Sequence, residues 1–125
     1  EKIAMYSHAD VFCCPSIYEP FGIINLEAMA CETAVVASAV GGIKEVVVHG
    51  ETGLLVPLQQ QTESPFEALH PEQYARDLAD GINTLMRDEP KRRAMALAGR
   101  QRAIDHFSWK SIARKTLALY KTLAG

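Results

Sequence analysis

Residues 11–57 read VFCCPSIYEPFGIINLEAMACETAVVASAVGGIKEVVVHGETGLLVP, and this stretch decides the fold. It contains three short apolar runs, at residues 11–15, 34–38 and 54–57. Apolar runs of this length that stop at turn residues are typical of strands buried on both faces. The segments 23–31 and 43–48, which lie between the runs, have the character of helices. Because strand and helix alternate, the stretch predicts a parallel sheet with helices on both faces.

The sequence on either side of this stretch predicts only half of a larger sheet. Residues 2–9 have the character of a helix end, and no strand precedes them. Doubly wound, Rossmann-like α/β sheets are built from two halves, and three strands account for one of them. We therefore expect residues 1–125 to be the C-terminal portion of such a domain, with its first strands upstream.

Downstream of the sheet, the sequence predicts a loop and three extra C-terminal helices. Residues 59–70 are polar and without periodicity, which indicates a loop inserted beside the sheet. Helices are expected to begin at Pro71, after Pro90 and after Ser108, a suitable N-cap. The last helix carries an apolar stripe that must pack against something, which can lie outside this chain: Trp109, Ile112, Ala113, Thr116, Leu117 and Tyr120.

Composition and charge exclude several classes of protein. The 125 residues include 13 basic and 15 acidic side chains, for a net charge of −2. Acids are interspersed among the bases of the second half, so we expect a solvated surface and no nucleic-acid interface. No apolar run approaches the roughly 20 residues of a membrane-spanning helix, and residues 1–3 lack a basic segment that leads into an apolar one, so we expect neither a membrane span nor export. These features favour a cytoplasmic protein.

The cysteines and histidines indicate neither a disulfide nor a metal site. Cys13 and Cys14 are adjacent in a predicted strand, so their side chains point to opposite faces and pair poorly. The sequence has no Cys-x-x-Cys, and no two of the four histidines share a helical spacing. We expect reduced thiols packed as small apolar groups.

Two glycine-containing turns predict a phosphate-binding crevice. The turn Pro20–Ile23 leads into a helix whose first N–H groups lack internal partners, and such an end attracts anions. Gly22 leaves room for an anion to approach the backbone, and Gly41 and Gly42 repeat the arrangement after the next strand. Both turns follow strands, so they should flank one crevice at the carboxyl edge of the sheet. Glycine alone is weak evidence, since any tight turn favours it.

Two glutamates, Glu19 and Glu27, lie in the same segment. Asn25 and Glu27 are the only polar positions of a helix, residues 23–31, that we expect to be covered on most sides. Glu27 either accepts from the paired hydroxyls of a ribose or lies on the open edge of the helix. Glu19 precedes the helix, where it can cap free N–H groups or accept from a sugar hydroxyl.

The run from Glu19 to Ala28, with seven residues between its two glutamates, resembles retaining nucleotide-sugar glycosyltransferases of the double-Rossmann type. The resemblance continues through residues 35–38, 41–47 and 50–56 to Phe107-Ser108-Trp109, so it covers nearly the whole chain. It is strongest for bacterial glycogen synthases of the actinobacterial type. Departures occur at Glu32 and Ala34, where many members carry glycine and proline, and at Lys44, where proline is frequent.

The resemblance implies a function and a site. Glu19 would contact the donor hexose as the catalytic-site carboxylate, backbone amides around Phe21, Gly22 and Ile23 would hold the diphosphate, and Glu27 would bind ribose. Gly41 and Gly42 would line the donor side of the cleft. The chain would then be the C-terminal part of a donor-binding domain.

The implied reaction moves glucose from ADP-glucose or UDP-glucose to an α-glucan or sugar acceptor. The resemblance implies front-face displacement, in which the leaving diphosphate helps to deprotonate the acceptor, so Glu19 is not expected to be a nucleophile. No metal or other cofactor is implied. The acceptor domain and an arginine–lysine pair that neutralises the diphosphate are expected upstream.

Three alternatives stay open on the sequence. The donor hexose can differ, as in a mannosyltransferase or a sucrose-type synthase. The chain can be a noncatalytic nucleotide-binding module, although a phosphate-only site would need neither Glu19 nor Glu27. It can also be a structural fragment that binds nothing in isolation.

Overall fold

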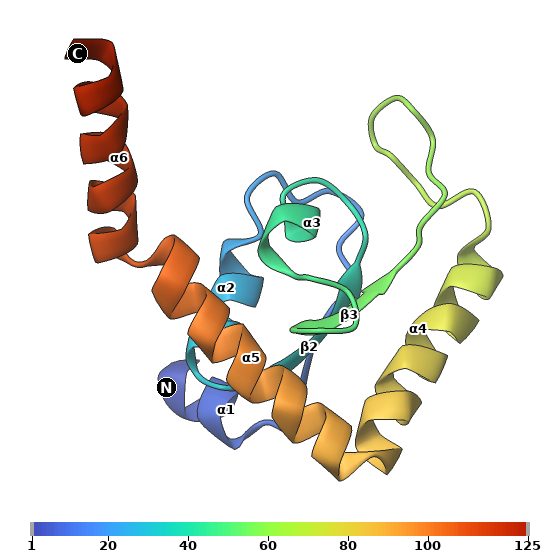
Figure 1. Ribbon diagram of the computed structural model, residues 1–125. Coiled ribbons are helices and arrows are strands. Elements are labelled where there is room, and N and C mark those ends of the chain that lie inside the picture. Colours follow the sequence, from blue (N-terminus) through green and yellow to red (C-terminus); the bar gives the residue numbers. More distant parts are fainter. Residues whose placement is uncertain (1, 125) are drawn as a thin grey trace.

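The computed structural model describes residues 2–124, as six helices and three strands (Figure 1). The first part of the chain alternates helix and strand: α1 (Lys2–His8), β1 (Val11–Cys14), α2 (Ile23–Ala30), β2 (Ala34–Ser38), α3 (Ile43–Val46) and β3 (Gly53–Val56). Three longer helices follow: α4 (Pro71–Arg87), α5 (Glu89–Phe107) and α6 (Trp109–Ala124). The predicted order of elements is confirmed.

The three strands form a parallel sheet in the order β1-β2-β3. β2 lies in the middle, with Ala37 opposite Cys14 of β1 and Ser38 opposite Val56 of β3. All five residues of β2 are buried. A strand that is apolar at every position except Ser38 therefore lies between two covered faces, as parallel sheets require.

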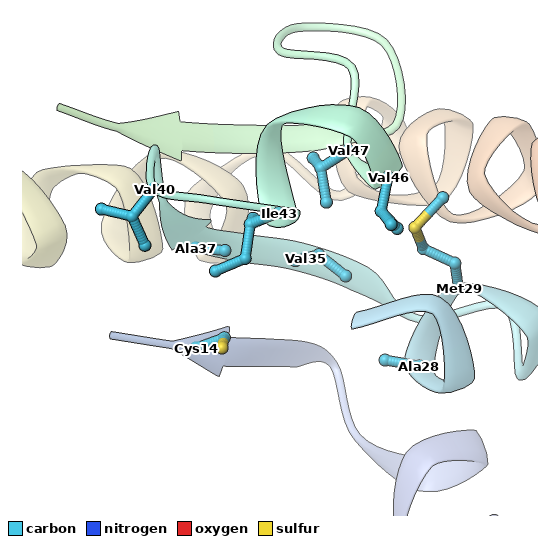
Figure 2. Close-up of a cluster of buried hydrophobic side chains, with 9 residues drawn as sticks. All are labelled: Cys14, Ala28, Met29, Val35, Ala37, Val40, Ile43, Val46 and Val47. Atoms are coloured by element: carbon cyan, nitrogen blue, oxygen red, sulfur yellow. The ribbon is translucent and has the colours of Figure 1, made fainter. Parts of the chain in front are cut away.

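Each face of the sheet has its own cluster of buried side chains. One cluster, drawn in Figure 2, joins the sheet to α2 and α3: Cys14, Ala28, Met29, Val35, Ala37, Val40, Ile43, Val46 and Val47. The other lies on the opposite face and includes residues of α4 and α5: Ala34, Val36, Val56, Leu85 and Met95. Alternate residues of β2 enter alternate clusters, so the predicted covering of both faces is confirmed.

Helix α5 fixes the ends of the two short helices. The Arg100 side chain donates to the carbonyl of Ala30, the last residue of α2. Arg102 donates from Nε to the carbonyl of Val46, the last residue of α3, at 2.8 Å. Carbonyls at a helix end lack partners within the helix, so both arginines satisfy groups that α2 and α3 leave free.

The segment between β3 and α4 is a loop, as the sequence predicts, and it folds back on itself as a short hairpin. Gln60 and Ala68 form an antiparallel bridge. The backbone N–H groups of Gln61 and Leu69 donate to the carbonyls of Glu67 and Gln59 at 3.0 and 2.8 Å. The backbone of residues 59–69 pairs within this hairpin and not with the sheet. Its side chains therefore do not alternate between a buried and an exposed face.

Helix α6 begins as predicted but does not pack along its length. The Ser108 hydroxyl accepts from the Ser111 N–H at 3.1 Å, which confirms the predicted cap. The helix projects away from the body of the molecule (Figure 1), and Trp109 is 86% exposed. Its predicted apolar stripe finds little cover within residues 2–124.

The described residues also bear on the expectations for cysteines and membranes. Cys13, Cys14 and Cys31 are free thiols. None of the helices within residues 2–124 combines the length and the apolar character needed to cross a membrane. Burial raises the pKa of the Cys13 thiol above its usual value, so this group stays protonated at neutral pH.

Candidate functional site

The loop that follows β1 carries Glu19, whose carboxylate folds back onto its own backbone. Glu19 Oε1 accepts from the N–H of Gly22 at 3.1 Å and from that of Phe21 at 3.4 Å. The hydrogen bonds of residues 2–124 leave Oε2 of Glu19 without a partner. Glu19 therefore binds two N–H groups of the turn that precedes α2 and does not cap the free N–H groups of the helix itself, so the sequence's capping alternative holds only for the turn. One carboxylate oxygen stays available to a ligand.

The two glycine turns pack directly against each other. The N–H of Gly42 donates to the carbonyl of Glu19 at 2.9 Å. A Cβ on Gly41 would lie 2.3 Å from the Glu19 carbonyl oxygen, and one on Gly42 would lie 2.4 Å from that of Pro20. Both distances are impossible for a real side chain, so only glycine allows this contact.

This packing corrects the reason given for Gly22. The sequence suggested that Gly22 clears space for an anion, yet its missing Cβ would point at the Gly42 carbonyl oxygen, 3.2 Å away. Gly22 also has a φ of 69°, in the left-handed region that favours glycine. The glycines therefore serve the contact between the turns, and that contact sets the position of Glu19.

Helix α2 presents free N–H groups beside this loop. The N–H groups of Asn25 and Leu26 donate to the Gly22 carbonyl, whereas those of Ile23 and Ile24 have no acceptor within the described part of the chain. Ile23 is 55% exposed and Ile24 is also exposed, so α2 is open at its N-terminus, whereas residues 25–29 are buried or half-buried as expected. Two exposed N–H groups at a helix N-terminus form a site that can bind an anion.

One residue of this helix turn, Asn25, was not singled out from the sequence. Its side chain is fully buried, and neither Nδ2 nor Oδ1 has a hydrogen-bond partner. An amide left unpaired in this way costs about 1–3 kcal/mol per group. Burial depends on the folded arrangement around α2, so sequence periodicity gave no signal for it.

Glu27 lies on α2 one helical turn beyond Ile23, and its side chain faces α1. Its Oε2 accepts from the Tyr6 hydroxyl at 3.0 Å and pairs with Lys2 Nζ at 3.4 Å. The side chain is 35% exposed, so Glu27 is neither buried nor on a fully open edge. Its carboxylate already has two donors from α1, which the sequence did not predict, and Oε1 has no partner among residues 2–124.

Tyr6 is held so that it can donate to Glu27. Its ring packs edge-on against Phe12, with ring centres 5.4 Å apart, and its carbonyl accepts from the Thr33 hydroxyl. Burial, and then the hydrogen bond to Glu27, raise the pKa of the Tyr6 hydroxyl above its usual value. The hydroxyl therefore stays protonated at neutral pH.

Two open cavities meet at Glu27. One, of about 410 Å³, lies between α2 and α5, and the other, of about 520 Å³, lies between α1 and α2. Within residues 2–124, no group of three His, Cys, Asp or Glu side chains is arranged to hold a metal ion. The candidate site thus joins Glu19, Phe21, Gly22, Gly41 and Gly42 at one end of α2, and it places Glu27 apart from them, against α1.

Comparison with known proteins gives this geometry a context. The family model described as glycosyl transferases group 1 matches residues 1–64. Alpha-maltose-1-phosphate synthase of Mycolicibacterium smegmatis is 51% identical over 118 residues, which cover 94% of this chain and 28% of that protein. D-inositol 3-phosphate glycosyltransferase of Corynebacterium aurimucosum is 38% identical over 123 residues, covering 96% of this chain and 25% of that protein.

Solved structures show the same fold. Sucrose-phosphate synthase from Thermosynechococcus elongatus aligns with a TM-score of 0.72 and 41% identity, over 94% of this chain and 26% of that one. Anabaena HepE, in complex with UDP and glucose, aligns with a TM-score of 0.72 and 28% identity. The alignment covers 94% of this chain and 29% of that one. The chain therefore spans between 25% and 29% of the lengths of these relatives.

Proposed function

The chain belongs to the group 1 glycosyl transferases, and from this membership we propose that it is the C-terminal, donor-binding part of a retaining hexosyltransferase. The observation that carries the proposal is the pairing of Glu19 with the free N-terminus of α2. Glu19 Oε1 fixes the loop, while the N–H groups of Ile23 and Ile24 remain free beside it. A nucleotide sugar presents both a diphosphate and a hexose to such a site.

We assign the parts of the donor to separate residues. The diphosphate lies at the N-terminus of α2, beside Phe21 and Gly22, and accepts from the free N–H groups of Ile23 and Ile24. The free oxygen of Glu19 accepts from a hexose hydroxyl, and the free oxygen of Glu27 accepts from the ribose. Gly41 and Gly42 act through the loop that they support. This division follows the places of the two glutamates, with Glu19 in the loop before α2 and Glu27 in the second turn of that helix.

The proposed reaction is transfer of glucose from ADP-glucose or UDP-glucose with retention at the anomeric carbon. The bond to the leaving phosphate breaks while the bond to the acceptor oxygen forms on the same face, and the leaving diphosphate takes the acceptor proton. Glu19 is not a nucleophile in this scheme, because the acceptor oxygen attacks the anomeric carbon directly and no covalent intermediate forms. An arginine and a lysine from an upstream segment neutralise the diphosphate. No metal or organic cofactor forms part of the proposal.

The names of the relatives bear on the acceptor. Alpha-maltose-1-phosphate synthase, sucrose-phosphate synthase and D-inositol 3-phosphate glycosyltransferase are all named for a phosphorylated small molecule. Within the range of an α-glucan or a sugar acceptor, these names favour a small phosphorylated sugar over glycogen. The acceptor would bind through an N-terminal domain that precedes this part of the protein.

A transfer assay on the full-length protein tests the function. ADP-glucose, UDP-glucose and GDP-mannose are each supplied with glucose 1-phosphate or glycogen, and release of nucleoside diphosphate is measured. We expect turnover with a glucose donor and an α-linked product by NMR. A β-linked product would contradict retention, preference for GDP-mannose would assign a mannosyltransferase, and nucleotide binding without transfer to either acceptor would indicate a binding module.

Two variants test the assignment of the glutamates in the same assay. Glu27→Gln should lower the affinity for free nucleoside diphosphate and for the donor alike, by about 10- to 100-fold, as expected for the loss of hydrogen bonds to a charged group. Glu19→Gln should mainly reduce transfer and leave nucleoside diphosphate binding nearly unchanged. Glu51→Gln, at an exposed turn, is the control. Equal losses of nucleotide affinity in both variants would contradict the assignment.

A further inference from the structure

The hairpin between β3 and α4 packs against the loop that carries Glu19. The Gln60 side chain donates from Nε2 to the carbonyl of Ile17 and, at 2.9 Å, to that of Phe66. The Phe66 ring stacks on the Tyr18 ring, with centres 5.5 Å apart and planes 7° from parallel. Residues far apart in the sequence therefore meet immediately before Glu19.

These contacts single out two residues of a solvated hairpin. Gln60 and Phe66 are half-buried, whereas residues 61–65 between them are exposed. Gln60 Nε2 reaches both its own hairpin and the Glu19 loop, so one side chain links the two segments. Phe66 adds a flat apolar contact, and stacked aromatic rings attract each other beyond the area they bury. The hairpin thus contacts the Glu19 loop through a hydrogen bond and an aromatic stack.

The loop is held on its other side by the glycine turn. The Gly42 N–H donates to the Glu19 carbonyl, and Gly41 packs against the same oxygen so closely that a Cβ there would lie 2.3 Å from it. Tyr18 remains 65% exposed even with its stacked partner, and Ile17 is exposed as well. Without the hairpin, the residues that precede Glu19 would have cover on one side only.

We propose that the hairpin is a brace, in which Gln60 and Phe66 are positioning residues that fix Glu19 for the donor hexose. The inference rests on the proposed function, because it takes Glu19 to contact the hexose. Neither Gln60 nor Phe66 touches the donor; they act through Ile17 and Tyr18. Removing the brace should therefore affect the hexose and leave the nucleotide, which binds along α2, in place.

The test uses the full-length protein and compares two adjacent glutamines. Gln60→Ala should lower the rate of transfer by about 10- to 100-fold, since small displacements of a catalytic group have effects of that size. The affinity for UDP or ADP should change by less than about twofold, a difference too small to reflect a lost hydrogen bond. Gln61→Ala, whose side chain is exposed, should match the unmodified protein in both measurements. Phe66→Ala should behave like Gln60→Ala, and Phe66→Tyr should retain transfer.

Hydrogen exchange separates the brace from the proposed function. In Gln60→Ala, the N–H groups of Phe21 and Gly22, which Glu19 caps, should exchange faster than in Gln61→Ala, whether or not the protein is active. Unchanged exchange at both groups would overturn the brace. Faster exchange in a protein that neither binds a nucleotide nor transfers a sugar would keep the brace and reject the proposed function. Loss of transfer together with an equal loss of nucleotide affinity in Gln60→Ala would also overturn the brace.

Discussion

At the scale of single residues, the contact between two glycine turns determines where Glu19 lies. The Glu19 carbonyl oxygen fits against Gly41 with no room for a Cβ, and its carboxylate caps the N–H of Gly22. Both ends of Glu19 are therefore fixed by backbone groups. A methyl group in this contact must displace the loop, because neither partner is a flexible side chain.

Two glycines with positive φ provide a matched comparison. A Cβ at Gly41 would lie 2.3 Å from the Glu19 carbonyl oxygen, while one at Gly50 would meet nothing within 4 Å. Both substitutions to alanine strain the backbone by about 1–2 kcal/mol, but only Gly41→Ala also displaces Glu19. We expect Gly41→Ala to reduce transfer by at least about tenfold relative to Gly50→Ala. Similar transfer rates in the two variants would show that Glu19 does not depend on this contact.

At the scale of elements, α2 connects the features of the site. Its N-terminus carries the free N–H groups, its second turn carries Glu27, and its C-terminus ends in a left-handed turn at Glu32. Glu32 has a φ of 62°, and the N–H groups of Glu32 and Thr33 donate to the carbonyls of Met29 and Ala28 at 3.0 and 3.1 Å. Helices commonly end in this way with glycine in the left-handed position. Glutamate at this position strains the end of α2.

Replacing this residue should stabilise the protein. Glu32→Gly removes the strain of a left-handed glutamate and is expected to raise the free energy of unfolding by about 1 kcal/mol. Glu32→Ala removes the carboxylate but keeps the strain, so it should give no such gain. The measurement is the urea concentration at the midpoint of unfolding. A gain of equal size in both variants would attribute the effect to charge and not to the backbone.

The elements could be predicted from the sequence where their signals are local. The three strands and the starts of α4 and α6 depend on short apolar runs, on Pro71 and on Ser108, all of which act within a few residues. The hairpin contact of Gln60 with Ile17 spans 43 positions, and that of Tyr6 with Glu27 spans 21. Such contacts leave no periodic pattern. Sequence reasoning could therefore propose candidate site residues but not the side chains that hold them.

At the scale of the whole molecule, the site extends along one helix that lies on a two-faced sheet. The Glu19 loop and the glycine turn lie at the carboxyl edge of the sheet, and Glu27 faces α1 beside two open cavities. The arginines of α5 anchor the far ends of α2 and α3. This arrangement gives the proposed donor a direction, with the hexose at Glu19, the diphosphate at the start of α2 and the ribose at Glu27.

A crystal structure of the full-length protein with UDP or ADP tests this central claim most directly. Phosphate oxygens should lie within hydrogen-bond distance of the Ile23 and Ile24 N–H groups, and ribose hydroxyls should donate to the free oxygen of Glu27. Tyr6 should remain bonded to the other oxygen of Glu27. A nucleotide bound at the amino edge of the sheet, or one that leaves both N–H groups and Glu27 untouched, would contradict the account.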